Sequence, residues 1–300
     1  MTVRIAVLAF GLLTIGAQSQ NGVSRPRILG IDHVSFYTTQ AEGIKKLYEG
    51  TLGLTSSAPV EPGLIRYLVG KQWVGYSTAP NASATDRLDH IAFSTDNVAA
   101  LRQYLIANGV KASAIVGRAD HSLSFTMKDP EGHLIEFVER GEVEQPAPPA
   151  DSAVSRHLIH AGFVVYHRDA EDHFYRDILG FHLYWHGASK DGQPDEWVAM
   201  QVPDGTDWLE YMLNQPERMD LRLTGIMNHI SLGVADMKKA QAMMESHGWK
   251  PHGDEAAEIG RDGKWQLDVF DPDFSRVELM DFKPTQKPCC FDFSGPHPSE

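Results

Sequence analysis

The sequence predicts an α+β fold in which four βαβββ modules pair into two domains. Three observations predict it. Four segments open with a histidine at the head of a short strand of alternating apolar residues, and a helical stretch that ends at a glycine follows each of them. A proline-rich stretch then divides the four units into two pairs. A strand, a helix and further strands cannot bury an open sheet alone, so we expect the modules to pair.

The four opening strands carry the repeat most clearly. They read Gly30-Ile-Asp-His33-Val-Ser-Phe, Arg87-Leu-Asp-His90-Ile-Ala-Phe, Leu158-Ile-His160-Ala-Gly-Phe and Ile226-Met-Asn-His229-Ile-Ser-Leu. In a strand, the residues two and four places after each histidine share its face of the sheet. Each module therefore presents a histidine at the same structural position.

A helix is predicted after each opening strand, because apolar residues recur three and four places apart over residues 41–52, 97–108, 170–179 and 237–247. Each stretch ends at a glycine that suits the left-handed residue after a helix. These are Gly53, Gly109, Gly180 and Gly248. The last strand of each module is expected at residues 71–78, 133–139, 207–213 and 275–281.

The domain boundaries follow from this repeat. We expect a first domain over residues 28–140, with modules 28–80 and 87–140, and a second domain over residues 156–283, with modules 156–214 and 224–283. Residues 141–155, Pro-rich and polar, have the composition of a linker. Residues 284–300 form a C-terminal tail.

The N-terminus has the pattern of a secretory signal peptide. Arg4 precedes an apolar run over residues 5–17, and polar residues follow it. A membrane-spanning helix needs about 20 apolar residues, so a signal peptide over residues 1–20 is favoured over an uncleaved anchor. We therefore expect a secreted or periplasmic protein that has no membrane attachment after cleavage.

Charge and cysteine content limit the function classes. The formal net charge of −13, with 27 scattered Lys and Arg residues, argues against a nucleic-acid partner and favours a small-molecule substrate. Pairing of modules within one chain suits a monomer or a homodimer. The two cysteines, Cys289 and Cys290, are adjacent, so an ordinary bridge between them would be strained and no disulfide framework is expected. Their role is left open.

With these motifs in place, the chain resembles the vicinal oxygen chelate superfamily, which includes glyoxalase I, bleomycin and fosfomycin resistance proteins, and extradiol ring-cleaving dioxygenases. The resemblance covers nearly all of residues 28–283. Besides the four histidine strands, it is carried by Leu47-Tyr-Glu-Gly-Thr-Leu-Gly-Leu54, Phe174-Tyr-Arg-Asp-Ile-Leu-Gly-Phe181 and the turns Asp129-Pro-Glu-Gly and Asp271-Pro-Asp.

The resemblance implies a divalent metal ion held by the first and last strands of paired modules. In the second domain it implies the ligands His160, Glu210, His229 and Glu278. In the first domain it implies a possible second metal site of His33, His90 and Glu136, with Gly75 where Glu210 stands in the second. Imidazole and carboxylate ligands suit iron, manganese, nickel, zinc or cobalt equally well.

Three function classes follow from the resemblance. The first is a metal-dependent enzyme on a vicinal-oxygen substrate, with lyase or isomerase proton transfer slightly favoured and Glu210 or Glu278 as the catalytic base. The second is an extradiol dioxygenase of catechol-like substrates, although Asp268 and Thr126 stand where that family usually has a tyrosine. The third is a non-catalytic binding protein like the bleomycin resistance proteins.

Overall fold

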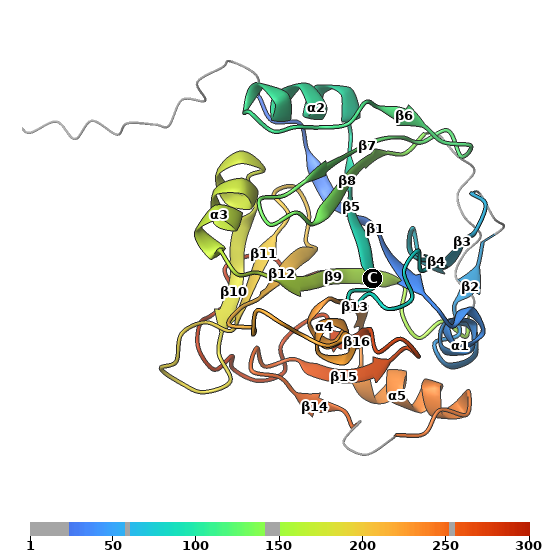
Figure 1. The fold of residues 1–300 in the computed structure, drawn as a ribbon. Coiled ribbons are helices and arrows are strands. Elements are labelled where there is room, and N and C mark those ends of the chain that lie inside the picture. Colours follow the sequence, from blue (N-terminus) through green and yellow to red (C-terminus); the bar gives the residue numbers. More distant parts are fainter. Residues whose placement is uncertain (1–23, 58–60, 142–150, 252–255) are drawn as a thin grey trace, which may run out of the picture.

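A computed structural model describes residues 24–57, 61–141, 151–251 and 256–300 of the chain (Figure 1). The predicted signal peptide and most of the predicted linker lie outside these residues and remain predictions. Within the described ranges, no helix is both long enough and apolar enough to span a bilayer.

The first domain contains two βαβββ modules in chain order. The first consists of β1 (Ile28–Thr38), α1 (Ala41–Lys45), the π-helical turn η1 (Lys46–Thr51), β2 (Thr55–Ser56), β3 (Leu64–Val69) and β4 (Gln72–Thr78). The second consists of β5 (Leu88–Thr95), α2 (Val98–Ala107), β6 (Val116–Gly117), β7 (Leu123–Lys128) and β8 (Leu134–Glu139).

The second domain repeats this order and adds one helix. Its first module consists of β9 (His157–Val164), α3 (Arg168–Asp172), η2 (His173–Ile178), β10 (His182–Gly187), β11 (Trp197–Gln201) and β12 (Trp208–Met212). The last module consists of β13 (His229–Val234), α5 (Met237–Ser246), β14 (Glu258–Ile259), β15 (Trp265–Phe270) and β16 (Arg276–Asp281). The additional helix α4 (Leu221–Met227) lies between the modules, begins at an Asp220 cap and was not predicted.

Each domain is one curled eight-stranded sheet. The strand orders are β2-β3-β4-β1-β5-β8-β7-β6 and β10-β11-β12-β9-β13-β16-β15-β14. In both sheets the first strands of the two modules pair antiparallel at the centre, and each also pairs in parallel with the last strand of its own module. The predicted α+β fold of four paired βαβββ modules is therefore confirmed.

Alternation along the central strands separates a packed face from a polar one. On β1, Val34 and Phe36 belong to the hydrophobic core, whereas His33 and Ser35 point to the other face of the sheet. The predicted glycines after the helices all have positive φ, and at Gly53 a side chain would also collide with the carbonyl oxygen of Ser152 at 2.0 Å. That close approach docks the end of the linker against the first domain.

Two aspartate turns join the domains. The Tyr175 hydroxyl donates to Asp129 Oδ2 at 3.1 Å, and at the matching joint the Tyr76 hydroxyl donates to Asp271 Oδ2 at 3.1 Å. At the first joint a second carboxyl group, that of the fully buried Glu171, accepts a hydrogen bond from the Glu131 backbone N–H at 3.0 Å, and at the second joint buried Asp273 lies beside Asp271. Burial, followed by the nearby Asp129 charge, raises the pKa of Glu171 from 4.5 to about 8.

This shift predicts a pH-dependent effect of Glu171→Gln. A raised pKa means that the folded state favours the protonated carboxyl, so its stability contribution is complete below about pH 4.5 and is lost as the pH rises toward 8. The neutral amide avoids that loss. We expect the variant to melt about 2–4 °C above the parent at pH 8.5 and to show a smaller gain at pH 5, by differential scanning calorimetry. The exposed control Glu245→Gln should show no such trend, and a gain for Glu171→Gln that is equal at both pH values would contradict the account.

Candidate metal centres

The first domain brings His33, His90 and Glu136 together. His33 Nε2 lies 3.0 Å from His90 Nε2 and 3.2 Å from Glu136 Oε2, and His90 Nε2 lies 3.3 Å from the same oxygen. His33 and Glu136 are buried, while His90 is partly open. All three residues proposed from the sequence for this site therefore converge on one point.

Strand register explains the convergence. On antiparallel β1 and β5, Ser35 lies opposite His90, and on parallel β5 and β8, Ala92 lies opposite Glu136. The three side chains thus project from adjacent strands on one face of the sheet. The pairing of the two modules is what assembles the site.

The spacing of these three atoms suits a divalent ion. Three ligands held about 2.1 Å from an ion, at right angles to one another, lie about 3.0 Å apart. Glu136 Oε2 is buried and makes no hydrogen bond among the described residues, while its other oxygen accepts from Arg118. The residues present therefore fit a metal ion, bound as a facial triad of two histidines and one carboxylate.

Each histidine of this triad is backed by the aspartate that precedes it. His33 Nδ1 lies 2.7 Å from Asp32 Oδ1, and His90 Nδ1 lies 3.0 Å from Asp89 Oδ2. Burial alone would lower the pKa of His90, but the carboxylates of Asp89 and Glu136 raise it to about 9. Burial alone would raise the pKa of Asp32, but its contacts with His33 and Arg140 lower it to about 2. Carboxylates on Nδ1 turn both Nε2 atoms toward one point, where a divalent ion would displace a proton on binding, a role of the Asp-His pairs that sequence analysis missed.

Gly75 does stand where the second domain has Glu210. Gly75 pairs with Ser35 two residues after His33, and Glu210 pairs with Gly162 two residues after His160. The space that a longer side chain would need is filled by Trp73, because a Cβ at position 75 would lie 2.6 Å from its ring. The Trp73 ring stacks on His33 with centroids 3.6 Å apart. The first site thus has three protein ligands and a rigid aromatic wall.

A cavity of about 370 Å³ opens beside this site. It is lined by residues of β1, β3, β4 and β5 and by the loops before β3 and β7, including Ser35, Glu61, Trp73, Asp89, His90 and Arg118. Its volume lies in the range of small-molecule sites. Because His90 lines it, a ligand in the cavity reaches the triad.

The second domain also brings its predicted ligands close together, but the distances between their ligand atoms vary more than in the first domain. His160 Nε2 lies 3.1 Å from His229 Nε2, and Glu210 Oε2 lies 3.3 Å from His229 Nε2 and 3.9 Å from His160 Nε2. Glu278 Oε2 lies 3.3 Å from His160 Nε2. His160, Glu210 and His229 therefore form one cluster, and Glu278 approaches it beside His160.

Two cations, half-buried Arg276 and fully buried Lys264, accompany this second set, and sequence analysis did not single them out. Arg276 donates through a terminal nitrogen to His229 Nε2 at 2.9 Å, while His229 Nδ1 lies 2.8 Å from the Met227 carbonyl oxygen. Lys264 is fully buried, with its ammonium 4.4 Å from the centre of the Trp208 ring. Burial, followed by the Arg276 charge, lowers the pKa of His229, so this histidine is neutral and accepts from Arg276.

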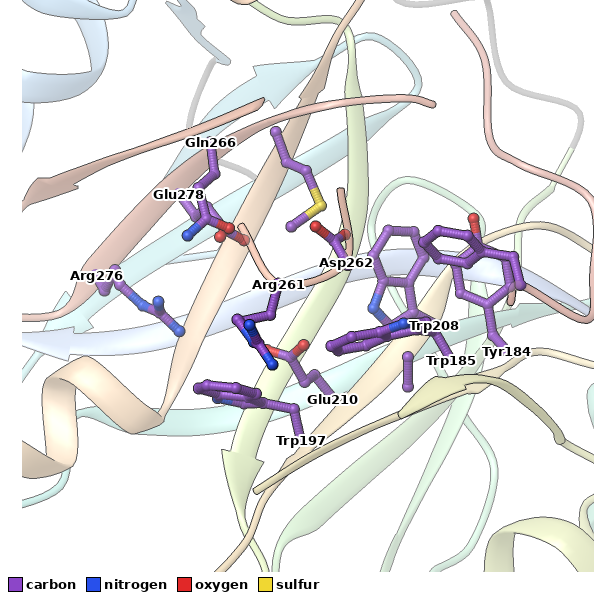
Figure 2. A pocket seen from close by; sticks show the side chains of 13 residues that line it. Tyr184, Trp185, Trp197, Trp208, Glu210, Arg261, Asp262, Gln266, Arg276 and Glu278 are labelled. Atoms are coloured by element: carbon purple, nitrogen blue, oxygen red, sulfur yellow. The ribbon is translucent and has the colours of Figure 1, made fainter. Parts of the chain in front are cut away.

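The cavity of the second domain is strongly aromatic (Figure 2). Trp185, Trp197 and Trp208 line it, and Glu210 and Arg276 reach into it. Asp268 lies opposite Glu278, and Thr126 lies opposite Glu136, so neither domain has a tyrosine at that place.

The C-terminal tail closes one side of this cavity. Phe293 lines it and packs on Tyr184 with ring centroids 4.7 Å apart, and the Pro296 carbonyl oxygen accepts a hydrogen bond from Gln201 Nε2 at 2.9 Å.

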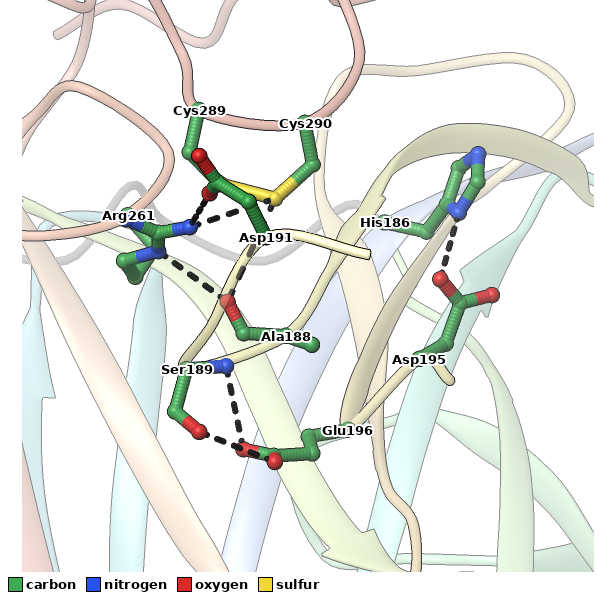
Figure 3. Close-up of a disulfide and its surroundings, with 9 residues drawn as sticks. All are labelled: His186, Ala188, Ser189, Asp191, Asp195, Glu196, Arg261, Cys289 and Cys290. Carbon is green, nitrogen blue, oxygen red and sulfur yellow. Dashed lines mark hydrogen bonds and ion pairs between the residues drawn. A yellow bond between two sulfur atoms is a disulfide. The ribbon is translucent and has the colours of Figure 1, made fainter. Parts of the chain in front are cut away.

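The expectation that the adjacent cysteines stay unbridged is wrong: Cys289 and Cys290 form a disulfide beside Asp191 and Arg261 (Figure 3). The two side chains of a local turn can meet directly, and the span of 3.7 Å between their Cα atoms is simply that of neighbouring residues.

Comparison with known proteins gives a family match over most of the chain. A model of the glyoxalase/bleomycin resistance protein/dioxygenase superfamily matches residues 30–137 and 157–279. Curated protein sequences contain no match.

Solved structures share the fold. The 2,3-dioxygenase LapB from Pseudomonas sp. KL28 superposes with a TM-score of 0.66 at 17% identity, covering 90% of this chain and 99% of that one. A catechol 2,3-dioxygenase gives 0.65 at 15% identity, covering 90% and 100%. Homoprotocatechuate 2,3-dioxygenase from Brevibacterium fuscum, in complex with 3,4-dihydroxyphenylacetate, gives 0.64 at 16% identity, covering 93% and 85%.

The aspartates behind the first triad predict a test of metal affinity. Asp89→Asn removes the charge that orients His90, and changes of this kind typically weaken metal binding about 10–100-fold. Equilibrium dialysis with Mn²⁺ measures the change. The exposed Asp96→Asn serves as the control because Asp96 lies on the same module away from the site. Equal affinities for the Asp89 and Asp96 variants would show that the Asp-His contact does not support a metal.

Proposed function

Because the chain belongs to the glyoxalase/bleomycin resistance protein/dioxygenase superfamily, we propose that it is a divalent-metal-dependent enzyme that binds a small substrate through two neighbouring oxygens at its first-domain triad. The observation that carries the proposal is the convergence of His33, His90 and Glu136 within 3.3 Å of one another at the edge of a cavity.

A divalent ion at this triad would supply Lewis acidity, stabilising negative charge on two adjacent substrate oxygens. The chain's own residues have distinct roles around it. Asp32 and Asp89 hold the two imidazoles in one tautomer, and Arg118 holds the outer oxygen of Glu136. Trp73 fixes the plane of the His33 ring and excludes water from its other face.

Ring cleavage of a catechol-like substrate by dioxygen is the reaction that the first site supports best. Three protein ligands leave coordination positions for a bidentate substrate and for dioxygen, the pattern of non-haem iron oxygenases. Arg118 lies at the cavity and can meet an ionised substrate oxygen. The similar folds of a catechol 2,3-dioxygenase and of homoprotocatechuate 2,3-dioxygenase in complex with 3,4-dihydroxyphenylacetate are consistent with this choice. Iron is accordingly the metal that we propose.

Proton transfer of the lyase or isomerase type is the second candidate, and it rests on the second domain. Glu210 Oε2 lies 3.3 Å from His229 Nε2 and also lines the aromatic cavity, so its carboxylate could take a proton from a ligand held there. Burial raises the pKa of Glu278 well above its usual value, which would let that carboxyl retain a proton. This candidate ranks lower because Arg276 already engages His229.

Matched glutamine variants separate the two reactions. With iron-loaded protein and catechol, we expect Glu136→Gln to lower oxygen uptake by roughly 100-fold or more, because it removes a metal ligand, and Glu210→Gln to leave it nearly unchanged. A Clark electrode gives the rate. If Glu136→Gln leaves the activity unchanged and Glu210→Gln abolishes hydrogen–deuterium exchange next to a substrate carbonyl, the lyase reaction is favoured. If neither reaction occurs but catechol raises the melting temperature, the chain is a binding protein.

A further inference from the structure

The two candidate metal centres differ at one position of their last strand. Two residues before Glu278 on β16 stands Arg276, and two residues before Glu136 on β8 stands Leu134. Side chains two residues apart share a face of the strand, so both reach toward their site. The first domain thus presents a neutral group where the second presents a guanidinium.

The guanidinium takes the lone pair that a metal would need. It lies 2.9 Å from His229 Nε2, and the other ring nitrogen of His229 faces the Met227 carbonyl oxygen. A neutral imidazole has one acceptor nitrogen, so a proton on Nδ1 leaves Nε2 as that acceptor, and Arg276 uses it. His229 therefore has no lone pair left for an ion.

The arginine of the first domain behaves differently. Arg118 contacts the outer oxygen of Glu136, and Oε2, which faces both histidines, makes no hydrogen bond. Each histidine there has its Nδ1 against an aspartate, so both Nε2 atoms face the site and can exchange a proton for an ion. The second domain has no such backing at His160, because His160 Nδ1 is buried and unpaired among the described residues.

Charge adds to the difference. Arg276 is half-buried beside the second set and pairs with Asp268 at 3.4 Å, and the ammonium of fully buried Lys264 lies among Trp208, Phe293 and Tyr184. The ammonium lies 4.0 Å from a carboxylate oxygen of Asp262. A guanidinium and an ammonium at this place would both repel a divalent ion.

We propose that Arg276 occupies the place of the metal in the second domain, so that the chain holds a single divalent ion, at His33, His90 and Glu136. The location of that single ion rests on the proposed function. The exclusion of metal from the second domain rests on the residues of that domain, chiefly Arg276, and the two parts can be tested separately.

Elemental analysis after dialysis against Mn²⁺ tests the proposal with four proteins: the parent, His33→Ala, Arg276→Leu and the double variant. Leucine is the residue that the first domain carries at this position, which makes it the matched replacement. We expect one ion per chain in the parent, none in His33→Ala, two in Arg276→Leu and one in the double variant. Circular dichroism and melting temperature confirm that each protein is folded.

The reciprocal variant Leu134→Arg keeps the proposal testable if Arg276→Leu does not fold. It introduces a guanidinium beside the first triad, and we expect it to remove the bound Mn²⁺ while the second domain stays unchanged. Retention of a full equivalent of Mn²⁺ by folded Leu134→Arg would contradict the proposal.

The outcomes distinguish the two parts. Two ions in the parent, or none in the folded double variant, would overturn the exclusion by Arg276. No ion in the parent together with one in the double variant would support that exclusion and refute the first-domain metal of the proposed function. One ion retained in His33→Ala would refute both.

Discussion

The antiparallel pairing of the first strands of two modules is the interaction on which the rest of this structure depends. It joins β1 to β5 in one domain and β9 to β13 in the other, and each of these strands also pairs with the last strand of its own module. Without it, His33 and His90 would belong to separate open sheets. With it, two histidines and a carboxylate meet on one face, opposite the core that the alternating residues Val34 and Phe36 fill.

The same backbone frame then gives two sites of different character, because the side chains around the histidines differ. In the first domain, aspartates hold both rings and a stacked tryptophan fills the space above a glycine. In the second, Glu210 replaces that glycine, a guanidinium engages one histidine, and the aromatic wall is completed by the tail. The repeated modules therefore determine the fold, and the few site-facing side chains that differ between the domains determine the chemical properties of each site.

Much of this architecture is predictable from the sequence, because it depends on periodicity and on glycines. The histidine strands, the helices and Gly53, Gly109, Gly180 and Gly248 are short-range signals, and the structure confirms them. The equivalence of Gly75 and Glu210 was also visible, since it needs only alignment of the modules. What could not be predicted depends on contacts between distant residues.

Arg276 is the clearest example. Its place two residues before Glu278 is readable, but its contact with His229, 47 positions earlier, depends on the parallel pairing of β13 and β16. The disulfide and the packing of Phe293 on Tyr184 likewise depend on how the tail folds back. The Asp-His pairs carried a local signal, because an aspartate directly before a strand histidine can reach its Nδ1.

The central claim is that the first-domain triad holds the divalent ion. Anomalous X-ray diffraction at the absorption edge of iron, from crystals of the iron-loaded chain, tests it most directly because it locates the ion without reference to activity. The account predicts one anomalous peak, bounded by His33, His90 and Glu136. A peak between His160 and His229 with nothing at the first triad would contradict it.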